Sequence, residues 1–521
     1  MMKLLRTISV LTVAAALASA AHAAEPKTVE PKTAVKECAA RPDAAKAVTR
    51  HAVDGADGKI GYTAKAATIA VRLKDADAEG EMFYVAYDAD RQDPAEKRPL
   101  TFVVNGGPGA AAAYLHILAF GPRIARLNGD GTIPPPPATM ENNPLTWLAF
   151  TDLVFIDPVG TGYSRSTKTD GDAKSFWQLD KDLESLVEFI RLYLTCEKRW
   201  QSPAFIAGES YGGFRTASLP GLLASDIGLR LNGLVLISPV LEFSFLEFDT
   251  YQPMPWALIL PSYAATALRQ GKSTLQRKNG QPLAEVLAPV EEMATGPFLT
   301  WLVRGSPADP PAGLALKQVA GILGLEEDSV RLRRGRISRQ QFARTLLRDS
   351  HRYVSLYDGA VDAIDPHPAS ASLHGDDPVL VPLTTLLART FPTYARGELS
   401  FPAEGMYQVL NSEVHRRWEW MSGRRTRQGF QGAADGLKEA MSLDPHLQVL
   451  VAHGYYDLIT PYLATAYTIR QMALDEAIRP NLEEKIYEGG HMFYTHEAAR
   501  RALFQDARAM YRRALSGRGV D

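Results

Sequence analysis

The feature that most constrains the fold is the segment Gly208–Gly212, with the sequence G-E-S-Y-G, which directly follows the apolar run Ala204–Ala207. A G-x-S-x-G sequence between a strand and a helix is typical of a nucleophile elbow, a tight turn that exposes a serine hydroxyl. Glycines are needed two positions either side of the serine, because side chains there would clash with neighbouring backbone. Ser210 is therefore predicted to lie at the N-terminus of a helix, where developing negative charge is favoured.

Strand-like and helical patterns alternate along most of the chain, which predicts an α/β fold. The later strand candidates are almost continuously apolar, as expected of strands buried on both faces of a parallel sheet. Together with the elbow, they predict the α/β-hydrolase fold, a mostly parallel central sheet flanked by helices. The predicted strands are Ala67–Leu73, Met82–Tyr87, Leu100–Val104, Leu153–Ile156, Ala204–Ala207, Leu234–Ile237, Leu447–Ala452 and Glu484–Tyr487, and the predicted helices include Trp177–Arg199, Tyr462–Leu474 and His496–Ser516.

The length of 521 residues exceeds what one hydrophobic core usually serves, so a large insertion or second domain is expected. Between Ile237 and Leu447 the sequence has no convincing buried strand, only helical patterns at Ala257–Gln270, Phe342–Arg348 and Glu413–Met421. We interpret residues 246–430 as a largely helical cap over the active site. Residues 24–245 and 431–521 are then the two parts of the hydrolase core. The first part begins with a loosely ordered lead-in from Ala24 to about Asp54.

The first 23 residues have the layout of a secretory signal peptide. Basic residues come first, followed by the apolar run Ile8–Ala18 and the A-x-A sequence Ala21–Ala23. A membrane anchor is the alternative, but the apolar run is shorter than the ~20 residues that a bilayer span needs. Removal of residues 1–23 predicts a periplasmic or secreted protein, in which Cys38 and Cys196 either pair or remain free thiols.

The formal net charge of −2 argues against a broad electrostatic attraction to nucleic acid or to an anionic membrane surface. We therefore expect no nucleic-acid partner and no stable membrane association. The sequence does not determine the oligomeric state.

A serine hydroxyl needs a base, and a histidine base needs an acid that fixes its orientation. His491 follows the predicted strand Glu484–Tyr487, and Asp457 follows the strand Leu447–Ala452. The order Ser210, Asp457, His491 is the order that this fold uses. His453 and His496 are the nearest rivals for the base.

The glycine-rich segment Asn105–Gly109 directly follows the strand Leu100–Val104 and is the candidate oxyanion hole. The fold takes one donor from a loop at this place and the other from the residue after the nucleophile, which predicts the N–H groups of Gly107 and Tyr211. A phosphate-binding loop is the alternative, but the segment matches neither the P-loop nor the G-x-G-x-x-G pattern. No metal or organic cofactor is expected.

These segments resemble the serine carboxypeptidases, particularly their exported bacterial members. The matching pieces occur in the family's order over most of the chain after residue 100. They are Asn105–Gly109, Asp157–Ser164, Gly208–Gly213, Gly454–Asp457 and Gly489–His491.

The resemblance implies cleavage of single residues from the C-terminus of a peptide substrate. It also implies that Asn105 and Glu209 hold the substrate's free carboxylate. The family uses a second Glu fourteen positions after the Asn, which shares a proton with the first, but this sequence has Ala119 there. We therefore expect Glu209 to be less readily protonated near neutral pH, and the preference for a free over an amidated C-terminus to be weaker than in relatives with both acids.

Two other functions remain compatible with parts of the sequence. An esterase or acyltransferase would use the same three residues on a different substrate, and no residue here decides between water and another acceptor. A non-catalytic periplasmic binding protein on a hydrolase scaffold is the second alternative, and the intact set of Ser210, Asp457 and His491 argues against it.

Overall fold

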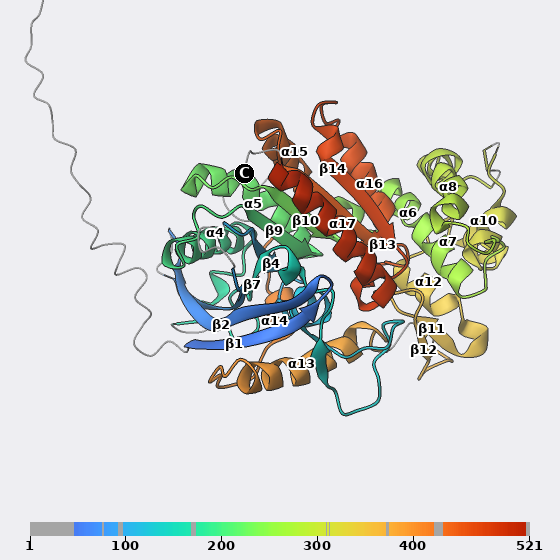
Figure 1. Ribbon diagram of the computed structural model, residues 1–521. Coiled ribbons are helices and arrows are strands. Elements are labelled where there is room, and N and C mark those ends of the chain that lie inside the picture. The colour runs from blue at the N-terminus through green and yellow to red at the C-terminus, as the bar shows by residue number, and fades with distance from the viewer. Residues whose placement is uncertain are drawn as a thin grey trace, which may run out of the picture. The chain divides into compact units, whose positions relative to one another are not determined.

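One ten-stranded sheet organises the fold, as a computed structural model of the chain shows (Figure 1). The structure describes residues 46–74, 78–91, 97–167, 173–308, 310–311, 313–370, 375–420 and 431–516. The strand order is β1-β2-β3-β7-β4-β9-β10-β13-β14, with β8 paired to β3. The strands are β1 (Lys46–Gly55), β2 (Gly58–Arg72), β3 (Glu79–Ala89), β4 (Leu100–Val104), β7 (Asp152–Ile156), β8 (Arg165–Ser166), β9 (Ala204–Glu209), β10 (Gly233–Ile237), β13 (Gln448–Gly454) and β14 (Leu482–Tyr487).

The sheet is parallel from β7 through to β14, whereas β1, β2 and β3 extend it in antiparallel fashion. The parallel strands carry apolar side chains on both faces, since successive residues such as Phe102 and Val103 contribute to opposite hydrophobic cores. Helices α4 (Leu179–Cys196), α5 (Tyr211–Ile227) and α15 (Ala434–Leu443) contribute to one core. Helices α13 (Leu380–Gly397) and α17 (Glu497–Ser516) contribute to the other, which confirms the predicted α/β-hydrolase architecture (Figure 1).

The prediction of a loosely ordered lead-in up to about Asp54 was wrong for its last residues, because β1 begins at Lys46. This strand pairs with β2 along its whole length, from Lys46 opposite Ala67 to Gly55 opposite Gly58. It lies at the edge of the sheet, where most of its side chains remain in contact with solvent. Its sequence is therefore polar and lacks the apolar run that revealed the central strands.

The predicted signal peptide and Cys38 lie outside the described residues. Cys196, at the end of α4, is disulfide-bonded. Within the described part of the chain, no helix is both long and apolar enough to cross a membrane.

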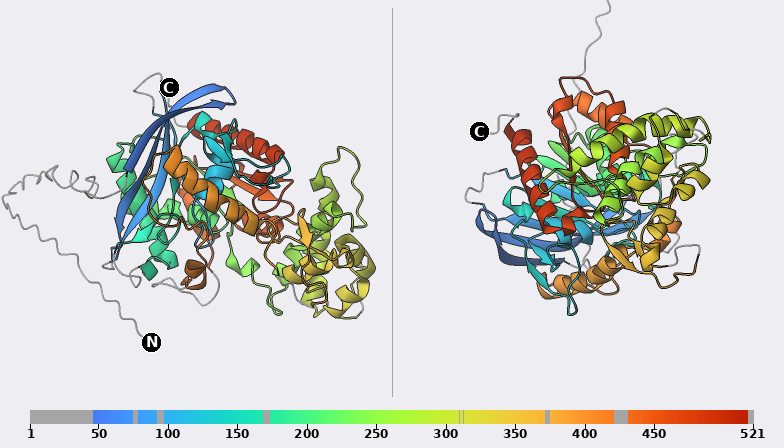
Figure 2. Two further views of the ribbon diagram at one scale, coloured as in Figure 1. Left: turned by 90° about the horizontal axis from the view of Figure 1, so that it is seen from below. Right: turned by 90° about the vertical axis from the view of Figure 1, so that its right-hand side faces the viewer.

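The interval between β10 and β13 contains mostly short helices (Figure 2). Those up to α12 contribute to a third hydrophobic cluster, which also includes residues of the segment after β13 such as Tyr455 and Leu463. Its described strands are short, with β11 (Arg352–Val354) pairing β12 (Asp362–Ile364). The helices are α6 (Pro253–Leu258), α7 (Leu260–Arg269), α8 (Leu283–Met293), α9 (Leu299–Val303), α10 (Leu316–Leu323), α11 (Glu327–Leu332), α12 (Arg339–Thr345), α13, α14 (Ser412–Arg416) and α15.

Helix α13 differs from the helices before it, because its buried face packs into the core of the central sheet. Leu387 and Phe391 are fully buried there, and the hydroxyl of Tyr394 lies 2.8 Å from that of Tyr87 on β3. Val414 of α14 and the buried face of α15, in the same interval, pack into the core on the opposite side of the sheet. The interval therefore contributes to all three hydrophobic clusters.

The remaining elements lie in the loops at the ends of the sheet strands and around the site. Strands β5 (Arg123–Ala125) and β6 (Met140–Asn142) form a separate pair. Helices α2 (Ala113–Leu115) and α16 (Tyr462–Gln471) follow β4 and β13, respectively. The candidate site residues come from the segments after β4, β9, β13 and β14, at the carboxyl ends of neighbouring strands, where ligands bind in open α/β sheets.

Candidate active site

The turn at Ser210 has the backbone geometry that the sequence predicts. Ser210 links β9 directly to α5 with φ 60° and ψ −122°, a strained combination for a residue that has a side chain. A Cβ atom on Gly208 would lie 2.1 Å from the carbonyl oxygen of Gly212, so the turn admits no side chain at position 208. The N–H of Ser210 donates a 2.9 Å hydrogen bond to the carbonyl of Ile237, which fixes the turn to β10.

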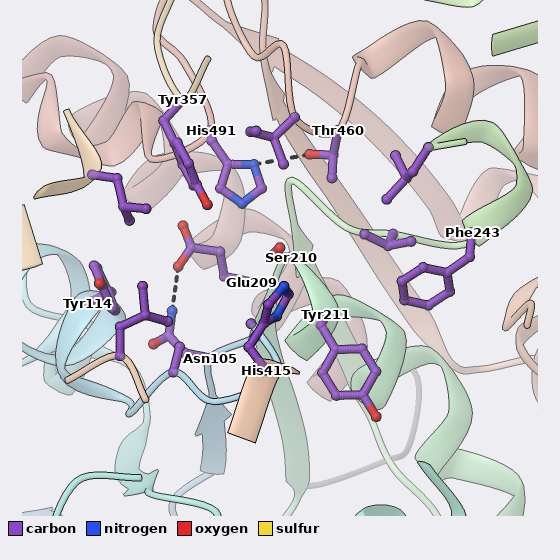
Figure 3. Close-up of a pocket in the computed structure, with 18 of the residues that line it drawn as sticks. Asn105, Tyr114, Glu209, Ser210, Tyr211, Phe243, Tyr357, His415, Thr460 and His491 are labelled. Carbon is purple, nitrogen blue, oxygen red and sulfur yellow. Dashed lines mark hydrogen bonds between the residues drawn. The ribbon is translucent and has the colours of Figure 1, made fainter. Parts of the chain in front are cut away.

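Asp457 and His491 are hydrogen-bonded, with 2.8 Å between Asp457 Oδ2 and His491 Nδ1. The carboxylate is fully buried, and its other oxygen accepts hydrogen bonds from the backbone N–H groups of Ile459 and Thr460. The Thr460 hydroxyl donates to Asp457 Oδ2 at 2.6 Å and lies 3.1 Å from His491 Nδ1. These contacts leave the Nε2 side of the imidazole available for the pocket (Figure 3).

The backbone of His491 is held from two sides. Its N–H donates to the carbonyl of Tyr357 at 2.5 Å, and its carbonyl accepts a hydrogen bond from the Ser238 hydroxyl at 2.8 Å. Burial lowers the pKa of the imidazole, but the charge and hydrogen bond of Asp457, together with the Glu209 carboxyl, outweigh burial and raise the pKa above its ordinary value. The pair is thus arranged to stabilise a protonated imidazole.

The two rival histidines lie elsewhere. His453 is buried at the end of β13, and burial lowers the pKa of its imidazole to about 4, so it stays neutral. His496 forms a 2.9 Å contact with Asp358 just before α17. Neither of them lines the pocket that contains Ser210 and His491.

The loop Asn105–Gly109 packs tightly against the turn at Ser210. A Cβ atom on Gly106 would lie 2.6 Å from the backbone nitrogen of Tyr211, so only glycine permits this approach. The carbonyl of Asn105 accepts a hydrogen bond from Arg215, whose guanidinium also pairs with the buried carboxylate of Asp182. The loop and the start of α5 are therefore fixed relative to each other.

Glu209 and Asn105 are hydrogen-bonded through Asn105 Nδ2 and Glu209 Oε2 (Figure 3). The other carboxyl oxygen of Glu209 accepts a 2.8 Å hydrogen bond from the hydroxyl of Tyr494. Burial raises the pKa of the Glu209 carboxyl to about 7, although His491 and the two hydrogen bonds act in the opposite direction. Glu209 is therefore protonated in a large share of molecules near neutral pH without a second acid beside it.

Most of the candidate site residues line one pocket (Figure 3). It encloses about 960 Å³ and is lined by Asn105, Gly107, Glu209, Ser210, Tyr211 and His491 together with residues of the long interval. Asp457 lies behind His491 and does not line it. Among the described residues, Ser210 and His491 line the same cavity without a hydrogen bond between their side chains, a separation common in substrate-free sites.

Comparisons with known proteins agree with the motifs. Residues 70–241 match the serine carboxypeptidase family. The chain is similar to the retinoid-inducible serine carboxypeptidase of Rattus norvegicus, with 32% identity over 124 residues, which is 23% of this chain and 24% of that protein. It is also similar to the lysosomal protective protein of Mus musculus, with 26% identity over 160 residues, 30% of this chain and 31% of that protein.

These alignments span only about a quarter to a third of each curated relative. A solved structure covers more: a prohormone-processing carboxypeptidase from Saccharomyces cerevisiae, with a TM-score of 0.52 and 16% identity over 85% of this chain and 90% of that one. At this identity the likeness shows the fold. The family match includes the loop at Asn105 and the turn at Ser210, whereas Asp457 and His491 lie beyond it.

Position 119 has a core methyl group where the resemblance predicts an acid. Ala119 lies in the one-turn π-helix His116–Phe120, and only 1% of its surface is exposed. It does not line the pocket. Sequence reasoning also missed Thr460 and Tyr494, since each is a single polar residue without a distinctive motif.

The described part of the chain contains no group of three or more His, Cys, Asp or Glu side chains placed to hold a metal ion.

We predict that Asp457→Asn lowers kcat by about 10⁴-fold while the fold is kept, because an amide in place of the carboxylate favours the wrong histidine tautomer and cannot stabilise the imidazolium. Steady-state kinetics and circular dichroism measure the two properties. An Asp457→Asn enzyme with more than a tenth of the wild-type kcat would show that another acid orients His491.

Proposed function

We propose that this chain is an exported serine carboxypeptidase, which releases the C-terminal residue of a peptide through an acyl-enzyme on Ser210. One observation carries the proposal: a single pocket contains Ser210, His491 and the hydrogen-bonded pair of Asn105 and Glu209. The first two supply a nucleophile and its base. The pair supplies neutral hydrogen-bond donors, which suit a substrate carboxylate.

In the proposed reaction, Ser210 Oγ attacks the scissile carbonyl while His491 accepts its proton. The N–H groups of Gly107 and Tyr211 stabilise the oxyanion, a contribution that typically exceeds 10²-fold in rate for each donor. His491 then returns the proton to the leaving amine, and water completes the cycle by the same route. Asp457 keeps the imidazole oriented throughout.

The substrate's terminal carboxylate lies, in this proposal, against Asn105 Nδ2 and the protonated carboxyl of Glu209. Both groups belong to segments that also carry the reaction machinery, since Glu209 precedes Ser210 and Asn105 begins the loop that contains Gly107. Binding of the carboxylate thus sets the position of the last peptide bond relative to Ser210.

The first test is chemical labelling of the nucleophile. A fluorophosphonate probe is expected to label wild-type protein at Ser210 and to leave Ser210→Ala unlabelled. The same substitution should lower peptide hydrolysis by on the order of 10⁶-fold. Labelling without cleavage of any C-terminal residue would favour an esterase or acyltransferase, and absence of labelling in the folded wild type would favour a binding protein.

The preference for a free C-terminus should depend on pH through Glu209. Below pH 7 the carboxyl is mostly protonated and donates to the substrate carboxylate; above its pKa of about 7 it is ionised and repels that carboxylate. We predict that the ratio of kcat/KM for a free peptide to kcat/KM for its C-terminal amide falls by roughly 10- to 100-fold as pH rises through this value.

Glu209→Gln is the matched control, because its side-chain amide remains a donor at every pH. Its ratio should be nearly constant between pH 5 and 9. Both enzymes share the activity rise that accompanies deprotonation of His491, so the ratio isolates the carboxylate site. A wild-type ratio that does not change with pH would remove Glu209 from substrate recognition.

We further propose that residues 1–23 are a signal peptide and that the mature protein is periplasmic or secreted. The disulfide at Cys196 suits an oxidising compartment, and one of the relatives is named as lysosomal. Mass spectrometry of the protein recovered from its native cells should give an N-terminus at Ala24. A protein that retains Met1 or Met2 would contradict this proposal.

We also retain the division into a core of residues 24–245 and 431–521 and a cap of residues 246–430. It is supported by the hydrophobic cluster that helices α6 to α12 form with residues of the segment after β13, and by the cap residues that line the pocket, including Arg339, Tyr357 and His415. Helix α13 belongs to the core by its packing, although it lies within the interval.

A further inference from the structure

The carboxylate site of the proposed function has room for a third donor. Position 119, where the family has its second acid, is occupied by a buried alanine outside the pocket. The donors that remain are Asn105 and Glu209, and these two already bond to each other. A substrate carboxylate has several acceptor positions on its two oxygens, so two donors leave part of its hydrogen-bonding capacity unused.

Tyr357 brings a further hydroxyl to the pocket that contains Glu209. It lines the pocket, and Figure 3 shows its hydroxyl directed into the cavity on the side of Glu209. Within the described part of the chain this hydroxyl makes no hydrogen bond, whereas the neighbouring hydroxyls are engaged. Tyr114 bonds to Thr384 at 2.7 Å, and Tyr494 bonds to Glu209 at 2.8 Å.

The backbone around Tyr357 is fixed, so its hydroxyl is held in place before substrate arrives. The Tyr357 carbonyl accepts the hydrogen bond from His491, and its N–H donates to the Ser355 hydroxyl at 2.9 Å. Ser355 in turn donates to the carboxylate of Asp377 at 2.7 Å. The ring meets the imidazole of His491 edge to face, with 5.5 Å between the ring centres.

The charges around Tyr357 keep its hydroxyl protonated. Burial raises the pKa of the phenol, and the carboxyl groups of Asp377, Asp457 and Glu209 raise it further, against a smaller opposing effect of Arg339. The hydroxyl is thus a donor over the whole working range of such an enzyme. This distinguishes it from Glu209, which loses its proton near pH 7.

We propose that the Tyr357 hydroxyl is the third group that binds the substrate's terminal carboxylate, in place of the acid absent from position 119. The proposal rests on the function proposed above and deepens it. The missing acid at position 119 predicts a weaker preference for a free C-terminus. In this proposal the Tyr357 hydroxyl offsets part of that loss.

Tyr357→Phe tests the proposal, since it removes the hydroxyl and keeps the ring against His491. We expect the ratio of kcat/KM for a free peptide to that for its amide to fall roughly 10- to 100-fold at pH 6, mainly through a higher KM for the free peptide. Cleavage of the amide and labelling by the fluorophosphonate probe should stay at wild-type rates.

Tyr353→Phe is the matched control, because its hydroxyl donates to the carbonyl of Asp376 and the residue does not line the pocket. It should keep the wild-type ratio. A second arm at pH 8.5, where Glu209 is ionised, should show a residual preference for the free peptide in wild type that Tyr357→Phe lacks. This difference would not arise if Tyr357 only supported the loop.

Three results would overturn the proposal in distinguishable ways. If Tyr357→Phe keeps the wild-type preference for the free peptide, Tyr357 does not bind the carboxylate, and the proposed function is unaffected. An equal loss of activity toward the free peptide and the amide makes Tyr357 a positioning residue for His491. If the wild type does not distinguish the free peptide from its amide, the pocket has no carboxylate-binding site, and both proposals fail.

Discussion

The strained turn at Ser210 is the constraint on which the rest of the site depends. The turn can form only because position 208 has no side chain and because β10 and the loop after β4 lie directly beside it. Its shape places Ser210 at the N-terminus of α5 and Glu209, one residue earlier, in the same pocket. A single backbone conformation thus positions both the proposed nucleophile and the proposed carboxylate receptor, so the two cannot move apart independently.

Burial controls the charge of this arrangement. Asn105 and Tyr494 donate to Glu209 and favour its ionised form, yet exclusion from water favours the neutral form more strongly and brings the pKa to about 7. A second acid is therefore not required to keep Glu209 protonated near neutral pH. Ala119 shows in the sequence that the partner acid of Glu209 is missing. The sequence does not show how strongly burial raises the pKa of Glu209, because burial depends on what covers the side chain in the folded protein.

The parts of the fold that the sequence predicts are those whose physical signal is local. Central strands such as β9 and β10 are buried on both faces and are apolar throughout, and the turn at Ser210 has steric requirements that are met within five residues. The edge strand β1 has no such signal, because exposed strands tolerate polar residues. Thr460, Tyr494 and Tyr357 were missed for a related reason, since each acts by its position in space and has no spacing pattern that identifies it.

Tyr357, in the long interval after β10, contributes to the site through both its backbone and its side chain. The carbonyl of Tyr357 holds the N–H of His491, and its ring packs against the imidazole. A substitution that moves this segment would therefore disturb the base, whereas one that changes only the hydroxyl would leave the base in place. Backbone contacts are available to any residue, so the loop can keep supporting His491 while its side chain changes. This separation allows the side chain at position 357 to change without loss of the backbone contact that holds His491.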